Sequence, residues 1–367
     1  MFIVGDPHFG YKSCSKIWYK RQSDYFKEIV FPYIKQHVEQ TDEASILVIT
    51  GDMFENDDSI NTIMMNNVIN MFYEFSQIID IHLIVGNHDT PYKNKNDVNT
   101  IKPFYYMKNV HVYDKPAKIE TADDRHIVMM PWFSDETKVK EILSNPENHD
   151  CYTVGHNYVN GFMYENGMPI QNVLTIEDHS NIKIAFYGHN HKKQVKDNVI
   201  SVGAPYQMKK SDIMNEPGFY HVVFEGDEPR ISFLPNHYSP TYKIVNLPEI
   251  MEMKLSDANK FVNNTMVLLK IPSNSDIDYT KIPEVLSGYI EIRDEHVNSK
   301  NVDDPDIIEI DESISISDKY VAYMESTKTL KLGKQYIDNT DNIKKAMITL
   351  FGKYMAKISK VSEEESV

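Results

Sequence analysis

The chain has little cysteine, no long apolar run and no excess of positive charge. Its only cysteines, Cys14 and Cys151, are too few for a disulfide framework and lack the CxxC spacing of a zinc or redox motif. We expect both thiols to be reduced and structural. No stretch of uninterrupted apolar residues approaches the ~20 residues that cross a bilayer, so no membrane association is expected.

The first residues of the chain and its net charge limit the expected location and the classes of function. Residues 1–4 form a short apolar run without the basic segment or cleavage site of a secretory signal. We therefore expect a cytoplasmic protein, in the host cytoplasm if the chain is viral. The 38 basic and 54 acidic residues give a net charge of -16, which argues against a freestanding basic nucleic-acid binder. Bound metal ions or a partner could still supply positive charge.

The first half of the chain alternates short apolar runs with segments of helical period, as in a layered α/β domain. Glycine and polar residues closely follow each run, which is typical of buried strands. The predicted strands span residues 2–4, 46–49, 82–85, 151–154 and 183–187. Apolar stripes predict core-facing helices over 25–34 and 60–75, and Pro32 is expected to kink or shorten the first of them.

The second half begins with a predicted hairpin of residues 219–224 and 230–234, joined by a turn at 226–229. Beyond it, helix and strand patterns alternate in a unit that suits a small α+β cap. These patterns cover 255–262, 266–271, 282–286 and 289–292. The acidic segment 303–317 is expected to link or edge this cap.

A last apolar stripe over 343–358 predicts an amphipathic helix with an N-cap at Asp341. Such a helix either packs on its own domain or docks onto a partner. The predicted organisation is a first domain, a cap, a helical partner-binding segment and a disordered acidic tail. Their ranges are 1–245, 246–317, 318–360 and 361–367.

Five polar clusters follow the five apolar runs, and their placement carries the chemistry. They are Asp6-Pro-His8, Gly51-Asp52, Gly86-Asn87-His88-Asp89, Gly155-His156 and Gly188-His189-Asn190-His191. The carboxyl ends of parallel strands lie along one sheet edge, so we expect these groups to converge. Oxygen and nitrogen ligands of this kind suit Mn, Fe or Zn, and the set is large enough for two metal ions. The other nine histidines lie outside the pattern, and we interpret them as surface or packing residues.

The motifs DxH, GD, GNHD, GH and GHxH in this order resemble the calcineurin-like metallophosphoesterase superfamily over about the first 240 residues. The GAPYQM run at 203–208, the cap and the terminal helical segment most resemble the SbcD-type nucleases, the recombination endonuclease subunits of tailed phages. This resemblance implies an α/β fold, a four-layer sandwich of two sheets flanked by helices, with a small α+β cap and a C-terminal helical segment.

The resemblance also implies roles for the motif residues. Asp6, His8 and His191 would hold the first metal ion. Asn87, His156 and His189 would hold the second, and Asp52 would bridge the two. His88 would stand beside the scissile phosphate as a catalytic residue, and Asp89 would orient it.

One position departs from the family pattern. Cellular relatives carry a histidine three residues after the bridging aspartate, where this chain has Glu55. Because that histidine helps to position phosphate or DNA, Glu55 is a candidate substrate-binding residue whose effect on cleavage is open. Lys192 and Lys193 are further candidate phosphate contacts, with Lys196, Lys209 and Lys210 nearby in sequence.

The resemblance implies a Mn-dependent DNA exonuclease and endonuclease, homodimeric, in a break-processing recombination complex. It implies two divalent metal ions as cofactors, and an SMC-like ABC ATPase of the SbcC type bound through the C-terminal helices. That ATPase must be a separate chain, because this sequence has no GxxxxGK[ST] loop. Two alternatives remain open: a phosphatase or cyclic-nucleotide phosphodiesterase acting on a small or protein-borne substrate, and a non-catalytic scaffold.

Overall fold

The structure is a computed structural model that describes most of the first 272 residues and shorter stretches beyond. The described ranges are 1–41, 43–92, 95–226, 228–262, 264–272, 291–297, 329–332 and 335–338, with Lys345 and Thr349. The chain divides into two units, Met1–Val297 and Asn298–Val367. No helix within these ranges is both long enough and apolar enough to cross a membrane.

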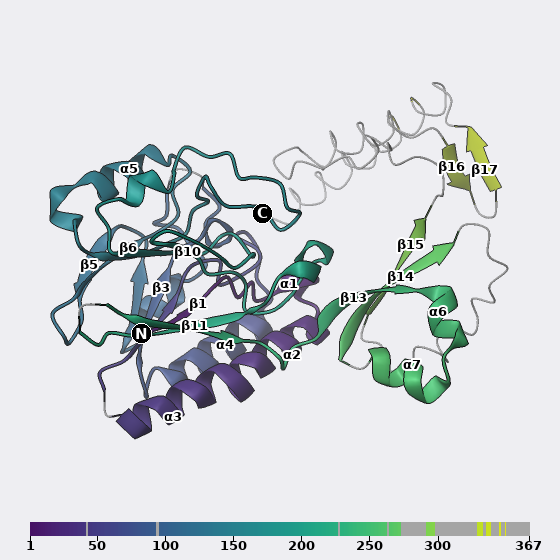
Figure 1. The fold of residues 1–367 in the computed structure, drawn as a ribbon, viewed down its shortest axis with the longest axis horizontal. Helices are drawn as coiled ribbons and strands as arrows, with labels where there is room; N and C mark the ends of the chain where they lie inside the picture. The colour runs from purple at the N-terminus through teal and green to yellow at the C-terminus, as the bar shows by residue number, and fades with distance from the viewer. Residues whose placement is uncertain are drawn as a thin grey trace, which may run out of the picture. The chain divides into compact units, whose positions relative to one another are not determined.

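Two six-stranded sheets form the centre of the first unit (Figure 1). In the first sheet β1 to β4 are parallel, and the antiparallel hairpin β11–β12 extends the sheet beside β1. Its strands, in spatial order, are β12 (Arg230–Pro235), β11 (Gly218–Val223), β1 (Phe2–Val4), β2 (Ile46–Ile49), β3 (Asp80–Ile84) and β4 (Val110–Tyr113).

In the second sheet, four parallel strands lie between two antiparallel edge strands. Its strands, in spatial order, are β5 (Ala117–Glu120), β6 (His126–Met130), β7 (Tyr152–Gly155), β8 (Ile184–Tyr187), β10 (Val199–Ser201) and β9 (Gln194–Lys196). The five strands predicted to precede the polar clusters are β1, β2, β3, β7 and β8, within two residues at each end.

Helices cover the outer face of each sheet (Figure 1). On one side lie α2 (Lys16–Tyr25), α3 (Phe31–Thr41) and α4 (Thr62–Phe75), and on the other lies α5 (Thr137–Ser144). Shorter turns are α1 (Tyr11–Cys14), η2 (Asn87–Asp89), η3 (Lys102–Tyr106), η4 (Pro146–Asn148), η5 (Glu177–His179) and η6 (Lys210–Met214). The predicted sandwich of two sheets flanked by helices is thereby confirmed.

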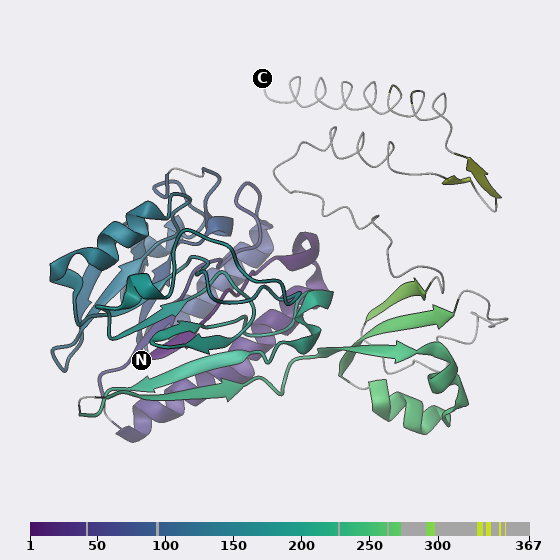
Figure 2. The same cartoon turned by 45° about the horizontal axis from the view of Figure 1, so that its top comes forward.

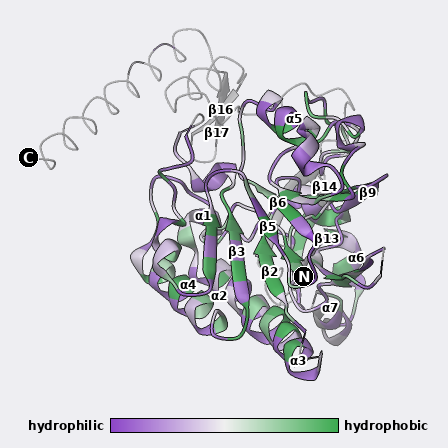
Figure 3. Ribbon diagram, turned by 90° about the vertical axis from the view of Figure 1, so that its left-hand side faces the viewer, coloured by the Kyte–Doolittle hydropathy of each residue, from purple (hydrophilic) through white to green (hydrophobic). Residues whose placement is uncertain are grey.

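Alternation along each strand explains the layering. Phe2 and Val4 face the helices α2 to α4, whereas Ile3 between them faces the second sheet. Val128 and Met130 pack toward α5, and Met129 packs between the sheets. Successive side chains of a strand point to opposite faces, so strands that are apolar throughout serve two cores at once. Figure 3 shows the result as hydrophobic colour along β2 and β6 and mixed colour on α3.

Pro32 does not shorten the first helical segment. A π-helical stretch, η1 (Phe26–Val30), lies directly before it, and the backbone N–H of Phe31 donates to the carbonyl of Phe26 five residues earlier. The widened turn lets α2 and α3 run on through a residue that lacks an N–H donor. Where we expected Pro32 to kink or shorten the helix, the helix continues through a π-helical segment.

The cap is a three-stranded parallel sheet of β13 (Thr241–Asn246), β14 (Thr265–Pro272) and β15 (Glu291–Val297). The helices α6 (Leu247–Glu252) and α7 (Leu255–Val262) lie together beside these strands (Figure 2). The domain boundary expected near residue 245 falls inside β13, which already belongs to the cap sheet. The hydroxyl of Tyr242 donates to the carbonyl of Met208 and so ties the cap to the GAPYQM run.

In the second unit the structure describes a two-stranded antiparallel sheet, β16 (Thr329–Leu332) and β17 (Gln335–Asp338). This sheet lies within the segment 318–360 that was expected to be helical, so that part of the segment is extended. The predicted helix at 282–286, the acidic linker 303–317 and the tail 361–367 lie outside the described residues. Of the predicted helix at 343–358, only Lys345 and Thr349 are described, and both are helical.

Candidate metal centre

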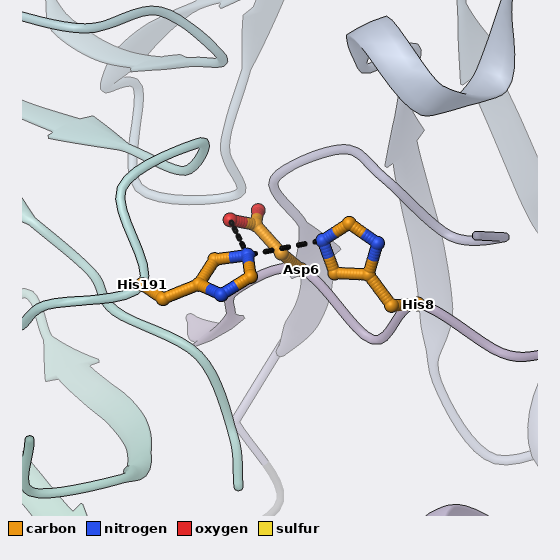
Figure 4. Close-up of side chains that lie close together, drawn as sticks. All are labelled: Asp6, His8 and His191. Atoms are coloured by element: carbon orange, nitrogen blue, oxygen red, sulfur yellow. Dashed lines mark hydrogen bonds and ion pairs between the residues drawn. The ribbon is translucent and has the colours of Figure 1, made fainter. Parts of the chain in front are cut away.

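The five polar clusters meet at the carboxyl ends of β1, β2, β3, β7 and β8. One group of donors joins Asp6 and His8, after β1, to His191, after β8 (Figure 4). The Nε2 atoms of His8 and His191 lie 3.0 Å apart, and the carboxylate of Asp6 is 3.9 Å from the His191 ring. Two imidazoles and a carboxylate thus point at a common position, although 183 residues separate the two histidines.

A second group of donors lies beside the first and consists of Asp52, His156 and His189, with ligand atoms within 4.8 Å of one another. Nε2 of His156 is 3.2 Å from the Asp52 carboxylate and 3.0 Å from the side-chain oxygen of Asn87. The same Asp52 oxygen is 3.6 Å from Nε2 of His8. Asp52 therefore lies between the two groups, and the bridging role that the resemblance implies for it stays a prediction.

Three of the donor residues have backbone conformations that non-glycine residues rarely adopt. The φ angles of His8, Asp52 and His189 are 46°, 49° and 76°. Left-handed backbone costs a non-glycine residue of order 1–3 kcal/mol and persists only where the surroundings over-determine it. These three are among eleven described non-glycine residues with positive φ, and in each of the three the strained residue is a donor of the site.

Two glycines leave room for the donors. A Cβ atom on Gly86 would lie 2.2 Å from the Asp52 carboxylate, and one on Gly188 would lie 2.5 Å from the Asp6 carboxylate. Real Cβ atoms do not approach other atoms so closely, so any side chain at these positions would displace a carboxylate. The glycines of GNHD and GHxH are therefore required by the donor that packs against each.

The carboxylates make this edge strongly negative. Burial lowers the pKa of His156, but Asp52 and Asp6 outweigh it and raise that pKa to about 9. Burial also opposes charge on His8, and contact with Glu55 and the charge of Asp52 raise its pKa to about 9. Burial and neighbouring cations hold the pKa of His189 and His191 well below the usual range. The carboxylates thus stabilise positive charge on two of the four rings, and a potential that stabilises cations is what a metal-ion site requires.

His88 is partly buried and lies beside the donor groups, with the centre of its ring 4.9 Å from that of His8. Its backbone N–H donates to the Asp52 carboxylate at 2.8 Å. Its Nδ1 lies 2.8 Å from the backbone carbonyl of Glu55. Because a carbonyl can only accept, this contact places a proton on Nδ1 and turns Nε2 away from it.

Asp89 was expected to orient His88, and within the described residues its carboxylate contacts other groups. Its buried carboxylate holds together the loops after β2 and β3 and the segment before η3. The donors are the backbone N–H groups of Met53, Phe54 and Gly86 and the hydroxyl of Thr100. Burial and the charge of Asp52 raise the pKa of Asp89 to about 6, against these hydrogen bonds. The Glu55 carbonyl thus contacts the His88 ring and Asp89 orders the loops, and the expected role of Asp89 in orienting His88 stays a prediction.

Several supporting residues were not predicted. The carbonyl of Thr50 accepts from Nδ1 of His156 at 2.8 Å, and the ring of Tyr158 lies 3.8 Å from that of His189. The side chain of Gln22 and the hydroxyl of Tyr206 both donate to the carbonyl of Pro7. Tyr206 belongs to GAPYQM, so that run braces the DxH loop. Thr50 and Tyr158 stand next to motif residues, whereas nothing in the sequence marks Gln22.

The two predicted lysine contacts differ in their surroundings. The ammonium of Lys193 pairs with Glu216 and lies 3.8 Å from the centre of the Phe233 ring. Lys192 is half-buried, and its backbone N–H donates to the side chain of Asn190. Lys209 is closer to the donors, because it pairs at 3.6 Å with Glu165, which accepts the backbone N–H of His191. A role for any of them in binding phosphate stays a prediction.

A two-sheet sandwich with paired oxygen and nitrogen donor groups at its strand ends defines a metal-dependent phosphoesterase. Residues 1–193, more than half of the chain, match the family described as calcineurin-like phosphoesterase. The chain belongs to this family, which uses divalent metal ions. The family predicted from the motifs is confirmed.

Individual relatives extend the similarity beyond this domain. The chain is 27% identical over 356 residues to exonuclease subunit 1 of Enterobacteria phage T4, covering 89% of this chain and 98% of that protein. It is 24% identical over 207 residues to the DNA double-strand break repair protein Mre11 of Nanoarchaeum equitans (strain Kin4-M), covering 48% of this chain and 55% of that protein. A third relative, putative phosphoesterase 244L of Invertebrate iridescent virus 6, is 30% identical over 90 residues, 24% of this chain and 27% of that protein.

Proposed function

We propose that this chain is a Mn-dependent DNA exonuclease and endonuclease that hydrolyses phosphodiester bonds with two metal ions. The observation that carries the proposal is the convergence of two donor groups around Asp52. Asp6, His8 and His191 would hold one ion, and Asn87, His156 and His189 the other. Asp52, whose carboxylate is within 3.6 Å of a ring nitrogen from each group, would bridge them.

The donor chemistry fits such ions. Carboxylate and amide oxygens with imidazole nitrogens are ligands of intermediate hardness, which suit Mn better than an all-oxygen or all-thiolate site would. When bound, two ions supply positive charge to the attacking and leaving oxygens of an in-line displacement and lower the pKa of a bound water. The chain itself supplies the fixed directions of the donors.

His88 is the proposed proton donor to the leaving oxygen. Its Nδ1–H is held by the Glu55 carbonyl, so the cationic ring carries its second proton on Nε2. Transfer of that proton to the leaving oxygen would restore the neutral ring with the Glu55 hydrogen bond intact. Positioned general acids of this kind contribute about 10²–10⁴-fold to a rate.

The choice of DNA as substrate rests on two relatives. One is an exonuclease subunit matched over nearly its full length, and the other is named for double-strand break repair. The first of these relatives is named as a subunit, which also supports a partner for this chain. We propose a homodimer within a break-processing recombination complex, joined through the C-terminal helices to an SMC-like ABC ATPase of the SbcC type.

The test is Mn²⁺-dependent release of nucleotides from linear duplex DNA by the purified protein, alone and with its ATPase. Activity that Asp52→Asn abolishes would support the nuclease. Hydrolysis of an aryl phosphodiester with DNA untouched, even with the ATPase, would instead indicate a phosphatase or a phosphodiesterase for small substrates.

The partner is tested separately by deleting residues 341–367. We expect the shortened chain to lose co-purification with the ATPase while it still hydrolyses the aryl phosphodiester. Continued co-purification would contradict docking through the terminal helix.

A further inference from the structure

Glu55 lies in the loop after β2, next to both the DxH loop and His88. Its backbone N–H donates to the carbonyl of Phe9 at 3.1 Å, and the N–H of Phe9 donates to the carbonyl of Met53 at 2.9 Å. These bonds join the loop that carries Glu55 to the loop that carries His8. The Glu55 side chain is 25% exposed, so most of it is enclosed at the edge of the donor cluster.

The carboxylate of Glu55 contacts a predicted metal ligand. Its Oε2 lies 2.8 Å from Nδ1 of His8, whose side chain is only 4% exposed. The other ring nitrogen of His8, Nε2, faces His191 at 3.0 Å and Asp52 at 3.6 Å. Nδ1 of His8 makes no hydrogen bond of regular geometry within the described residues, so the Glu55 carboxylate meets it as an ion-pair contact. One nitrogen thus faces the donor cluster, and the opposite nitrogen faces Glu55.

The two ring nitrogens of His156 are arranged in the same way. Its Nδ1 lies 2.8 Å from the carbonyl of Thr50, and its Nε2 faces Asp52 and Asn87. In both rings an oxygen outside the cluster lies 2.8 Å from Nδ1, as a hydrogen bond on His156 and as an ion-pair contact on His8, and Nε2 is the nitrogen that faces the cluster. Histidines that bind metal ions generally need such a partner, because it fixes both the tautomer and the orientation of the ring.

Glu55 also acts through its main chain. Its carbonyl accepts from Nδ1 of His88 at 2.8 Å, and the rings of His8 and His88 stand edge to face with an angle of 82°. A single residue therefore sets the direction of a predicted metal ligand with its carboxylate and of the predicted proton donor with its carbonyl. Substitution of the side chain removes the first contact and keeps the second.

We propose that Glu55 is a positioning residue of the metal centre, which holds His8 with Nε2 directed at the ion, and that it does not bind substrate phosphate. The inference rests on the proposed function, because it takes His8 as a ligand. A carboxylate would repel a phosphodiester, whereas a carboxylate beside Nδ1 favours a proton on that nitrogen and so leaves Nε2 free to bind a metal ion.

The experiment compares wild type, Glu55→Gln and Glu55→Ala by calorimetric titration with Mn²⁺ alone. Wild type is expected to bind two ions per chain. Glutamine keeps an acceptor for Nδ1 and loses the charge, whereas alanine loses both, so affinity at one ion should fall in the order Glu, Gln, Ala. Loss of such a partner typically weakens metal binding about 10–100-fold. The affinity at the second ion should stay at the wild-type value. When Co²⁺ replaces Mn²⁺ at both positions, only the site that contains His8 should show an altered visible spectrum.

Turnover provides the second readout. The lower kcat of both variants should rise toward the wild-type value as the Mn²⁺ concentration increases, and KM for duplex DNA should stay unchanged. Glu136→Gln is the matched control, because that carboxylate accepts the backbone N–H groups of Val173 and Leu174 and contacts none of the metal donors in the described contacts. It should leave both Mn²⁺ affinities intact.

Three results would overturn the assignment. Unchanged Mn²⁺ affinities with an altered KM for DNA would place Glu55 on the substrate. A third ion in wild type that disappears in Glu55→Gln would make Glu55 a ligand in its own right. Wild type that binds no Mn²⁺ would remove the proposed function and this inference with it, a failure that is recognised before any variant is tested.

Discussion

Buried histidines occur in two regions of this molecule, and burial alone does not distinguish them. His156 at the strand ends and His179 in η5 are both fully inaccessible. His156 is surrounded by the carboxylates of Asp6 and Asp52, whereas His179 contacts the carbonyl of Thr175 and the hydroxyl of Tyr187. Carboxylates raise the pKa of the first ring to about 9, and burial lowers the pKa of the second.

The difference shows what makes one edge of the sandwich a site. A buried imidazole among neutral partners stays neutral and serves packing, as His82 also does beside Tyr113. A buried imidazole among carboxylates lies in a potential that attracts cations. The predictions below test this contrast, first at the site and then away from it.

The largest effect is expected from Asp52→Asn, which removes the charge that lies between the two donor groups. Several kcal/mol of charge stabilisation would be lost, and each 1.36 kcal/mol is a factor of ten, so DNA hydrolysis should fall about 10³-fold or more. Mn²⁺-dependent nucleotide release measures this loss. Asp178→Asn is the control, since that carboxylate caps the backbone at Thr175 away from the donors. Comparable loss in the control would break the contrast.

His88→Ala should lower turnover about 10²–10⁴-fold while both Mn²⁺ ions still bind. The reason is that His88 lies beside the donor groups and is not a metal ligand in the proposed assignment. Single-turnover cleavage together with Mn²⁺ calorimetry separates the two properties. Unchanged turnover would remove His88 from the mechanism, and lost metal binding would make it a ligand.

Away from the site, His179→Leu should affect stability and leave turnover unchanged. The substitution leaves the carbonyl of Thr175 and the hydroxyl of Tyr187 without their partner, and buried polar groups left unpaired cost about 1–3 kcal/mol. Urea unfolding at pH 7 measures the loss, with kcat as the companion readout. A fall in kcat at full folding would show that this histidine is coupled to the site.

The smallest effect concerns the pH dependence of stability through His82. Burial and the neighbouring His111 lower its pKa from 6.5 to about 3. Between pH 6.5 and about pH 3, His82 is protonated in the unfolded chain and neutral in the folded chain. Stability that is present above pH 6.5 is therefore lost as the pH falls. The slope approaches about 1.4 kcal/mol per pH unit.

His82→Gln should remove this slope from urea unfolding measured between pH 6.5 and pH 5, relative to wild type. His126→Gln, at an exposed position on β6, serves as the control and should keep the wild-type slope. Identical slopes in all three proteins would show that His82 takes up a proton inside the fold.

Much of the architecture was determined by the sequence, because the signals are local. The continuous apolar runs Phe2–Val4 and Ile46–Ile49 mark strands buried on both faces, and a polar cluster directly after a strand must lie at its carboxyl end. The choice of aspartate, asparagine and histidine then limits the chemistry to metal ions of intermediate hardness. These inferences need no knowledge of which strands are neighbours.

Only the tertiary structure decided which side chains meet. His8 and His191 converge because two separate sheets pack face to face, and no local pattern reports that packing. The same holds for Glu55, whose carboxylate contacts His8 across 47 positions of sequence, and for Asp89, whose carboxylate accepts from the backbone of the loop after β2. Periodicity specifies the face on which a side chain lies, whereas its partner depends on long-range packing that forms only in the folded chain.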